Sequence, residues 1–165
     1  MENIVTFPIE NKDEIETLLK KHRFAGTTLR TNVAANNETT TIERKSGRVV
    51  LKKKIKSDIA REGPLFDAVQ KYHPWVEQLT LNKNLQCTRH TDRNDGDSLI
   101  ACFGDFEGGG LFVETLEGVQ HFTEKGVWYQ YNGRNPHWTE DFTGDRWSIV
   151  AYKKPVPKKT VLKII

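Results

Sequence analysis

The feature that most restricts the fold is a series of short β-type segments in the second half of the chain. From residue 76 onward, runs rich in β-branched and aromatic residues alternate with turn residues, and no helical period interrupts them. The segments are VEQLTLNKNLQC, SLIACFGDF, GLFVETL, VQHFT, GVWYQYN and RWSIVAYKK. Short strands at this spacing predict an all-β sandwich or a jelly-roll barrel.

The first part of the chain has a different pattern. Residues 11–22 place apolar side chains on one helical face, with acids early and lysines late, which predicts a packing helix. Residues 39–56 read as a β-hairpin, and residues 64–72 as a second helix that begins at a proline. We expect one α+β domain, mainly β, made of N-terminal helices and a hairpin (1–75), a β core (76–153) and a basic tail (154–165).

Charge and composition restrict the partners and the compartment. The chain has 25 basic and 22 acidic residues, and basic residues gather in segments 44–56 and 153–163. These segments could meet a polyanion such as DNA or RNA, or be only a solvated strand and a charged tail. No apolar run approaches the ~18 residues of a membrane span, and no signal peptide is evident, so we expect a soluble, intracellular protein. Cys87 and Cys102 read as buried thiols.

The stretch CTRHTDRNDGD contains a His-X-Asp triplet, His90-X-Asp92. If the strand before it runs on to Asp92, both side chains project from one face, because side chains alternate along a strand. The triplet alone is weak, and a metal site needs a third ligand. His137 is the natural one, since Pro136 fixes the backbone just before it. The other histidines read as structural or lie beside a hairpin: His22, His73 and His121.

Two histidines and one carboxylate form the facial triad that suits non-haem Fe(II) oxygenases, because it leaves adjacent coordination positions open. A co-substrate holder follows nine residues after His137, where Arg146 and Ser148 share a face of the last strand. A guanidinium with an adjacent hydroxyl suits the 5-carboxylate of 2-oxoglutarate. The simpler alternative for Arg146 is a surface ion pair with Asp141 or Asp145.

These residues resemble a known family. The order His90-X-Asp92, a glycine cluster at residues 108–110, Asn135-Pro136-His137 and Arg146-X-Ser148 is similar to the double-stranded β-helix core of the Fe(II)/2-oxoglutarate-dependent dioxygenases. The resemblance covers residues 76–153. It implies an enzyme that uses Fe(II), 2-oxoglutarate and O2, with iron on His90, Asp92 and His137 and the co-substrate on Arg146 and Ser148.

Within that superfamily the chain looks most like the TET/JBP group, which oxidises the 5-methyl group of pyrimidines in DNA. The resemblance implies a DNA substrate, with Arg93, Asn94, Asp95 and Trp138 as candidate substrate-binding residues. Many members have Asn where this chain has Asp95, with Asn94 just before it, so base recognition departs from the usual pattern. An acidic acceptor also suits the exocyclic amine of cytosine.

Two alternatives stay open. The short span from His137 to Arg146 and the RNPH wording are equally typical of prolyl-hydroxylase-like enzymes, which modify protein side chains. The same barrel could also be a non-enzymatic binding module in which His90 and Asp92 hydrogen-bond to each other. The glycine cluster could bring backbone close to a ligand or be only a turn. The sequence does not indicate an oligomeric state.

Overall fold

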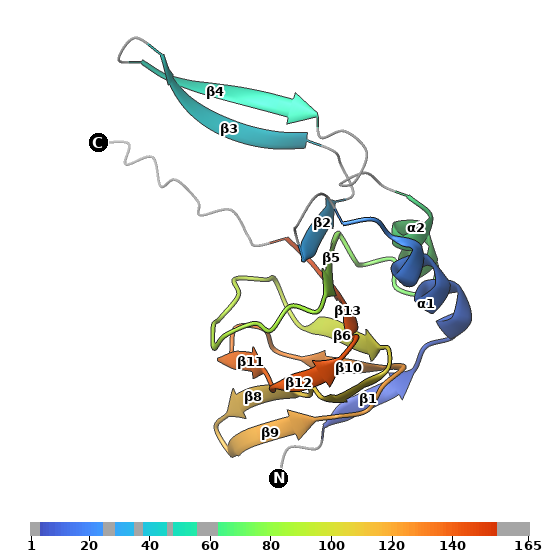
Figure 1. Ribbon diagram of the computed structural model, residues 1–165. Helices are drawn as coiled ribbons and strands as arrows, with labels where there is room; N and C mark the ends of the chain where they lie inside the picture. Colours follow the sequence, from blue (N-terminus) through green and yellow to red (C-terminus); the bar gives the residue numbers. More distant parts are fainter. Residues whose placement is uncertain (1–3, 25–28, 35–37, 46–47, 56–62, 155–165) are drawn as a thin grey trace.

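The centre of the molecule is a six-stranded antiparallel sheet in the order β1-β10-β6-β13-β5-β2 (Figure 1). The structure is a computed structural model that describes residues 4–24, 29–34, 38–45, 48–55 and 63–154. The sheet consists of β1 (Val5–Pro8), β10 (Val127–Tyr131), β6 (Ser98–Phe103), β13 (Trp147–Tyr152), β5 (Gln78–Lys83) and β2 (Arg30–Ala34). Strands from both ends of the chain therefore build this one sheet.

Two smaller antiparallel sheets lie against one face of the main sheet. One has the order β11 (His137–Thr139), β8 (Leu111–Thr115) and β9 (Gly118–Phe122), and the other pairs β12 (Phe142–Gly144) with β7 (Phe106–Gly108). Figure 1 draws most of these strands on the side of the main sheet away from the helices. A core cluster joins the layers: Ile100, Cys102, Phe106, Leu111, Val113, Phe122, Tyr129 and Tyr131. The mainly β fold predicted from the strand pattern, a sandwich or jelly-roll barrel, is confirmed.

Two helices, α1 (Lys12–Lys21) and α2 (Pro64–Gln70), cover the opposite face of the main sheet. Ile15 and Leu19 are the buried residues of α1, one helical turn apart, as the amphipathic pattern predicts. They pack in one cluster with Phe66 of α2 and with sheet residues such as Leu79 and Ile149. Pro64 begins α2, where its missing N–H costs no hydrogen bond. Both predicted helices are confirmed, each slightly shorter than expected.

The predicted hairpin is present as β3 (Glu38–Lys45) and β4 (Arg48–Ile55). Within the described residues these strands pair with each other and form a sheet of their own. They contain most of the first basic segment, while most of the second lies in 155–165, outside the described residues. In the described part of the chain, no helix is long and apolar enough to cross a membrane.

Several details differ from the expectations. Four short strands, β1, β2, β11 and β12, do not stand out in the sequence pattern. The strand expected to run on to Asp92 is wrong: β5 ends at Lys83, Asn84 has a left-handed φ of 55°, and the chain continues as a loop to β6. Cys102 is a buried thiol as predicted, whereas Cys87 is only half-buried.

Candidate metal centre

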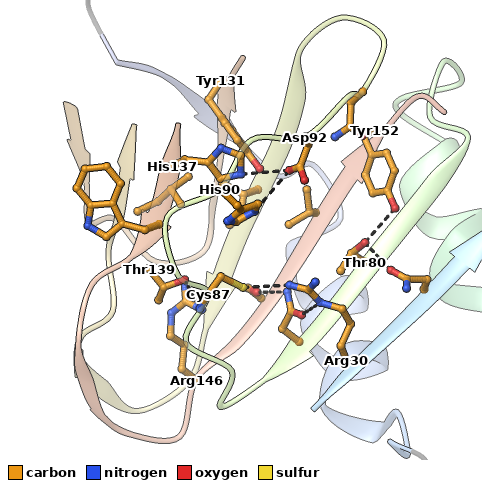
Figure 2. Close-up of a pocket in the computed structure, with 18 residues that line it drawn as sticks. Arg30, Thr80, Cys87, His90, Asp92, Tyr131, His137, Thr139, Arg146 and Tyr152 are labelled. Atoms are coloured by element: carbon orange, nitrogen blue, oxygen red, sulfur yellow. Dashed lines mark hydrogen bonds and ion pairs between the residues drawn. The ribbon is translucent and has the colours of Figure 1, made fainter. Parts of the chain in front are cut away.

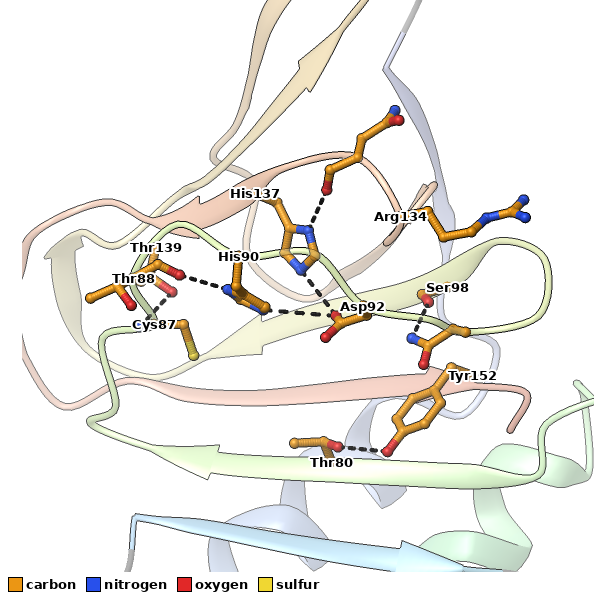
Figure 3. A network of polar contacts seen from close by, with 12 residues as sticks. Thr80, Cys87, Thr88, His90, Asp92, Ser98, Arg134, His137, Thr139 and Tyr152 are labelled. Atoms are coloured by element: carbon orange, nitrogen blue, oxygen red, sulfur yellow. Dashed lines mark hydrogen bonds and ion pairs between the residues drawn. The ribbon is translucent and has the colours of Figure 1, made fainter. Parts of the chain in front are cut away.

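The structure brings His90, Asp92 and His137 together. One potential ligand atom from each residue lies within 4.8 Å of the others, in a cluster found among the described residues (Figure 3). The Nε2 atoms of His137 and His90 lie 3.1 Å and 3.8 Å from Asp92 Oδ2. His137 is buried, while His90 and Asp92 are half-buried, so the cluster opens in one direction.

Backbone pairing, rather than a continuous strand, creates this cluster. His90 and His137 form an isolated antiparallel bridge, with N–H to carbonyl bonds of 3.0 Å and 2.9 Å in the two directions. The Asp92 N–H donates to the Gly133 carbonyl at 2.8 Å, which fixes the loop two residues further on. The loop of the triplet is therefore held by Gly133, just before β11, and by the first residue of β11, His137, which is the third residue of the cluster.

Hydrogen bonds also determine which nitrogen of each imidazole faces Asp92. Nδ1 of His90 lies 2.6 Å from the Thr88 carbonyl, and Nδ1 of His137 lies 2.7 Å from the Asn135 carbonyl. A carbonyl only accepts, so each Nδ1 carries a proton, and in a neutral imidazole Nε2 then presents a lone pair. In the absence of a cation, His137 Nε2 donates to Asp92 Oδ2 at 3.1 Å. A bound cation would take the place of that proton and would meet two imidazole lone pairs and a carboxylate at one point.

Asp92 stays ionised in this setting. Burial disfavours its charged form, but the hydrogen bond from His137 and the charges of His137, His90 and Arg30 outweigh burial and hold the pKa of Asp92 below its usual range. Tyr131 lies beside the cluster, with its ring edge-on to His137 at a centroid distance of 5.4 Å. Burial raises the pKa of the Tyr131 hydroxyl well above its usual value, so Tyr131 stays protonated.

The cluster forms part of the wall of a pocket between the main sheet and the small sheets (Figure 2). Arg146 and Ser148, the predicted co-substrate residues, line the same pocket. The sequence did not identify seven further lining residues with polar groups or a thiol: Arg30, Asn32, Thr80, Asn82, Cys87, Thr139 and Tyr152. The apolar part is formed by Ile100, Leu111 and Val150. One pocket thus holds a candidate metal cluster and two arginines.

Arg146 is buried and held from several sides. Its Nε donates to the Gly109 carbonyl at 2.8 Å and its guanidinium contacts Cys102 Sγ at 3.3 Å. The rings of Phe106 and Phe142 lie 5.8 Å and 5.7 Å from its guanidinium carbon. No carboxylate of the described residues pairs with it, so the surface ion pair with Asp141 or Asp145 is wrong.

The glycine cluster has a packing reason. Gly109 has a left-handed φ of 72°, and a Cβ there would lie 2.9 Å from Cδ of Arg146. A Cβ on Gly110 would lie 2.6 Å from the Phe122 carbonyl oxygen. The cluster therefore lets the backbone approach Arg146 and the neighbouring strand closely, and also forms the turn between β7 and β8.

The four candidate substrate residues lie in different places. Asn94 is buried, lines the pocket and donates to Ser98 Oγ at 3.1 Å. Trp138 also lines the pocket and stacks on Phe112 with a centroid distance of 5.2 Å. Arg93 is exposed and is not a lining residue. Asp95 is exposed and lines a separate depression beside Trp75. The structure brings Asn94 and Trp138 to the pocket but not Arg93 or Asp95.

The other three histidines lie outside the cluster. His22 bonds to Thr31 Oγ1 at 2.9 Å, and burial lowers its pKa. Burial also lowers the pKa of His73, against an opposing effect of Glu10, and its ring lies edge-on to Trp128. His121 lies on β9, with Nε2 3.2 Å from Glu140 Oε1.

Comparisons with known proteins give a fold but no close relative. No protein-family model and no curated protein matches the chain. A solved structure of an oxidoreductase of the 2OG-Fe(II) oxygenase family from Burkholderia pseudomallei matches 88% of this chain and 78% of its own, with a TM-score of 0.59 and 10% identity. The structure of NgTET1 in complex with 5mC DNA matches 90% of this chain and 70% of its own, with a TM-score of 0.58 and 13% identity. The chain therefore has the double-stranded β-helix fold of these oxygenases.

Proposed function

We propose that the chain is an Fe(II)- and 2-oxoglutarate-dependent dioxygenase. The observation that carries the proposal is the convergence of His90, Asp92 and His137 in one pocket with Arg146 and Ser148. The shared fold with oxygenase structures supports it. A binding module that uses the triplet only for hydrogen bonds would not need the buried guanidinium of Arg146 in the same pocket, which no carboxylate of the described residues pairs with.

The donor set fits ferrous iron. Two neutral imidazoles and one carboxylate form the facial triad of non-haem Fe(II) sites. In this chain the Nδ1–H groups are held by backbone carbonyls, so the two Nε2 atoms are ready to bind without rearrangement. His90, Asp92 and His137 would hold the metal, and the open side of the cluster faces the pocket.

The co-substrate would lie between the metal cluster and Arg146. The Arg146 guanidinium is the charge partner for the 5-carboxylate of 2-oxoglutarate, and Ser148 is a second hydrogen-bonding group beside it. When bound, iron and 2-oxoglutarate supply the oxidation of a C–H bond by O2, with succinate and CO2 as products. The chain itself holds and orients the reactants, while Ile100, Leu111 and Val150 restrict water.

The proposed target is the 5-methyl group of a pyrimidine in DNA, 5-methylcytosine or thymine. NgTET1, which has the same fold, was solved in complex with 5mC DNA. Asn94 and Trp138 line the pocket, where an amide and an indole could meet a base that has left the duplex stack. Arg93 and Asp95 are exposed outside the pocket, where they could contact the rest of the nucleic acid. The alternative substrate is a protein side chain, as in prolyl-hydroxylase-like enzymes.

Two measurements test the proposal in order. Anaerobic addition of Fe(II) and 2-oxoglutarate should produce a charge-transfer absorption band, and exposure to air with substrate should yield succinate. Absence of both would refute the oxygenase function. Mass spectrometry after incubation with methylated DNA or with peptides then decides the substrate. We expect 5-hydroxymethylpyrimidine from DNA, whereas hydroxylated peptide alone would refute the DNA substrate and support the alternative.

Asp95→Ala tests substrate recognition separately. We expect it to change the choice or turnover of DNA while succinate formation without substrate is unchanged, because Asp95 lies outside the pocket. Equal losses of both activities would contradict a role in substrate recognition. Asn94→Ala is the comparison inside the pocket, where Asn94 is buried and bonds to Ser98.

A further inference from the structure

A second guanidinium lies in the pocket and is linked to Ser148 through one side chain. Arg30 lies opposite Asn82 across β2 and β5, and Asn82 lies opposite Ser148 across β5 and β13. Arg30 Nε donates to Asn82 Oδ1 at 2.8 Å, and Asn82 Nδ2 donates to Ser148 Oγ at 3.1 Å. Three neighbouring strands thus carry a row of hydrogen-bonded side chains into the pocket.

The direction of each bond in this row follows from its first member. A guanidinium only donates, so the Asn82 atom that faces Arg30 is the carbonyl oxygen. The amide nitrogen of Asn82 therefore faces Ser148, and an amide N–H also only donates. Ser148 Oγ must accept this bond, so its own hydroxyl proton is left for another acceptor. Among the described residues, Asn82 is the side chain that hydrogen-bonds to Ser148.

Further contacts keep the row in place. The Arg30 guanidinium also donates to Cys87 Sγ at 3.0 Å, and Figure 2 shows Arg30 extending toward Cys87. Asn82 and Ser148 are both buried, and a buried amide that lost its carbonyl partner would be costly. Rotation of the Asn82 amide would place an NH2 group against the guanidinium, so the orientation is fixed.

We propose that Arg30 and Asn82 are positioning residues that keep the Ser148 hydroxyl oriented as a hydrogen-bond donor toward the carboxylate of 2-oxoglutarate. This inference rests on the proposed function. It assigns different roles to the two arginines of the pocket: Arg146 supplies charge to the co-substrate, whereas Arg30 acts through Asn82. Ser148 would otherwise be free to rotate and to offer a lone pair to an anion, which weakens binding.

The first test is a double-mutant cycle on co-substrate binding. The dissociation constant of 2-oxoglutarate is measured by calorimetry on Mn(II)-loaded protein, which requires no turnover. We expect Asn82→Ala and Ser148→Ala each to weaken binding roughly 10-fold, the scale of one hydrogen bond to a charged group. The double variant should be no weaker than Ser148→Ala, within about twofold, because residues that act as one unit are not additive. Additive losses would overturn the proposal.

The second test separates hydrogen bonding from charge at Arg30. In glutamine, Nε2 occupies the same number of bonds from Cα as Nε of arginine, so Arg30→Gln keeps the donor to Asn82 and removes the charge. We expect Arg30→Gln to bind 2-oxoglutarate nearly as well as the wild type, and Arg30→Met to bind it as weakly as Asn82→Ala. Equal losses of affinity in both variants would show that Arg30 acts by its charge and would overturn the proposal that it acts through Asn82. Arg23→Met, at an exposed arginine outside the pocket lining, is the control.

Folding is checked by circular dichroism for each variant. If Asn82→Ala does not fold, Asn82→Asp replaces it in the cycle, since it keeps the volume and the Arg30 bond but accepts the Ser148 proton. Asn82→Asp should then weaken binding in the wild-type background and much less in the Ser148→Ala background. Wild-type protein that binds no 2-oxoglutarate would refute the proposed function itself. If the wild type binds 2-oxoglutarate and the variants bind it equally well, only the positioning role of Arg30 and Asn82 is refuted.

Discussion

The two faces of strands β5 and β13 differ sharply in chemistry. Leu79 and Leu81 point toward the helices and are fully buried in an apolar cluster, whereas Thr80 and Asn82, between and after them, line the pocket. On β13, Ile149 and Ala151 belong to the apolar cluster, while Ser148, Val150 and Tyr152 line the pocket. Because side chains alternate along a strand, the same two strands supply both the core and the candidate site. Along each of these strands, residues of the apolar core thus alternate with residues of the candidate site.

On the pocket face, the polar side chains hydrogen-bond to one another. Thr80 Oγ1 donates to Asn32 Oδ1 at 2.8 Å and lies 3.0 Å from the Tyr152 hydroxyl. Since Thr80 has a single proton, Tyr152 donates to it. Burial raises the pKa of Tyr152, which keeps that proton in place. The helix-covered face needs no such network, so substitutions on the two faces should have different consequences.

The largest expected effect is loss of metal binding by a change on the pocket face. His90→Ala should lower the affinity for Fe(II) or Mn(II) by more than about 100-fold, because even loss of an outer partner of a ligand costs about 10- to 100-fold. Calorimetric titration of the metal-free protein measures this. His121→Ala, at an exposed histidine on β9, is the matched control and should bind metal as the wild type does. Unchanged metal affinity in His90→Ala would show that the metal does not bind at this cluster.

The next effect belongs to the helix-covered face. Leu81 is 1% exposed, and Leu81→Ala should lower the free energy of unfolding by about 2–5 kcal/mol, through lost burial and an unfilled cavity. Its neighbour Thr80 makes hydrogen bonds at the pocket, and Thr80→Ala should cost only about 0.5–1.5 kcal/mol. Urea denaturation compares the two variants. Similar losses at both positions would show that the faces are not separate in their contribution to stability.

The third prediction concerns the anchor for the co-substrate. Arg146→Met keeps an apolar stem beside Phe106 and Phe142 but removes the guanidinium, so the barrel should stay folded. The dissociation constant of 2-oxoglutarate should rise about 10- to 150-fold, the equivalent of a charge-assisted contact of ~1.5–3 kcal/mol. Arg89→Met is the control, since Arg89 is exposed and pairs with Glu114. An unchanged dissociation constant would leave Arg30 as the other candidate anchor.

The sequence predicts the local elements of this fold better than their pairing. The helices have a 3.6-residue apolar period and the longer strands have β-branched runs, and both signals lie within single segments. By contrast, β2 reads only RTNVA and gains its place by pairing with β5, about fifty residues away. Pairing between distant segments leaves little trace in either sequence, so Arg30 could not be recognised as a pocket residue. The alternation of leucine with polar residues in QLTLNK was a usable signal for Asn82.

The candidate site shows the same division. His90, Asp92 and His137 are recognisable because residue type and spacing are local, but the expected cause of their proximity is wrong. They meet through a two-residue bridge and a loop bond to Gly133, not through a strand. The sequence left two roles open for Arg146, a contact with the co-substrate or a surface ion pair with a carboxylate. Arg146 is buried beside Gly109, and this burial arises only when the segments of the two residues fold together. Sequence identifies the reactive groups, whereas tertiary packing determines their surroundings.

The smallest expected effect tests the helix-covered side through its histidines. Burial lowers the pKa of His22 and of His73 in the folded state, so the unfolded chain binds more protons near the ordinary histidine pKa of 6.5. Their contribution to stability is therefore present above that pH and is lost as the pH falls through it. We expect the urea midpoint of the metal-free protein to decrease between about pH 7.5 and 5.5.

A double variant, His22→Gln with His73→Gln, sharpens the comparison between the two faces. Glutamine keeps a polar side chain that can still bond to Thr31, but it does not titrate, so the midpoint should depend less on pH over this range. The carboxylates with lowered pKa values, Asp92 and Glu114, lose their stabilising effect only at more acidic pH. An unchanged slope in the double variant would contradict the assignment of this acid sensitivity to His22 and His73.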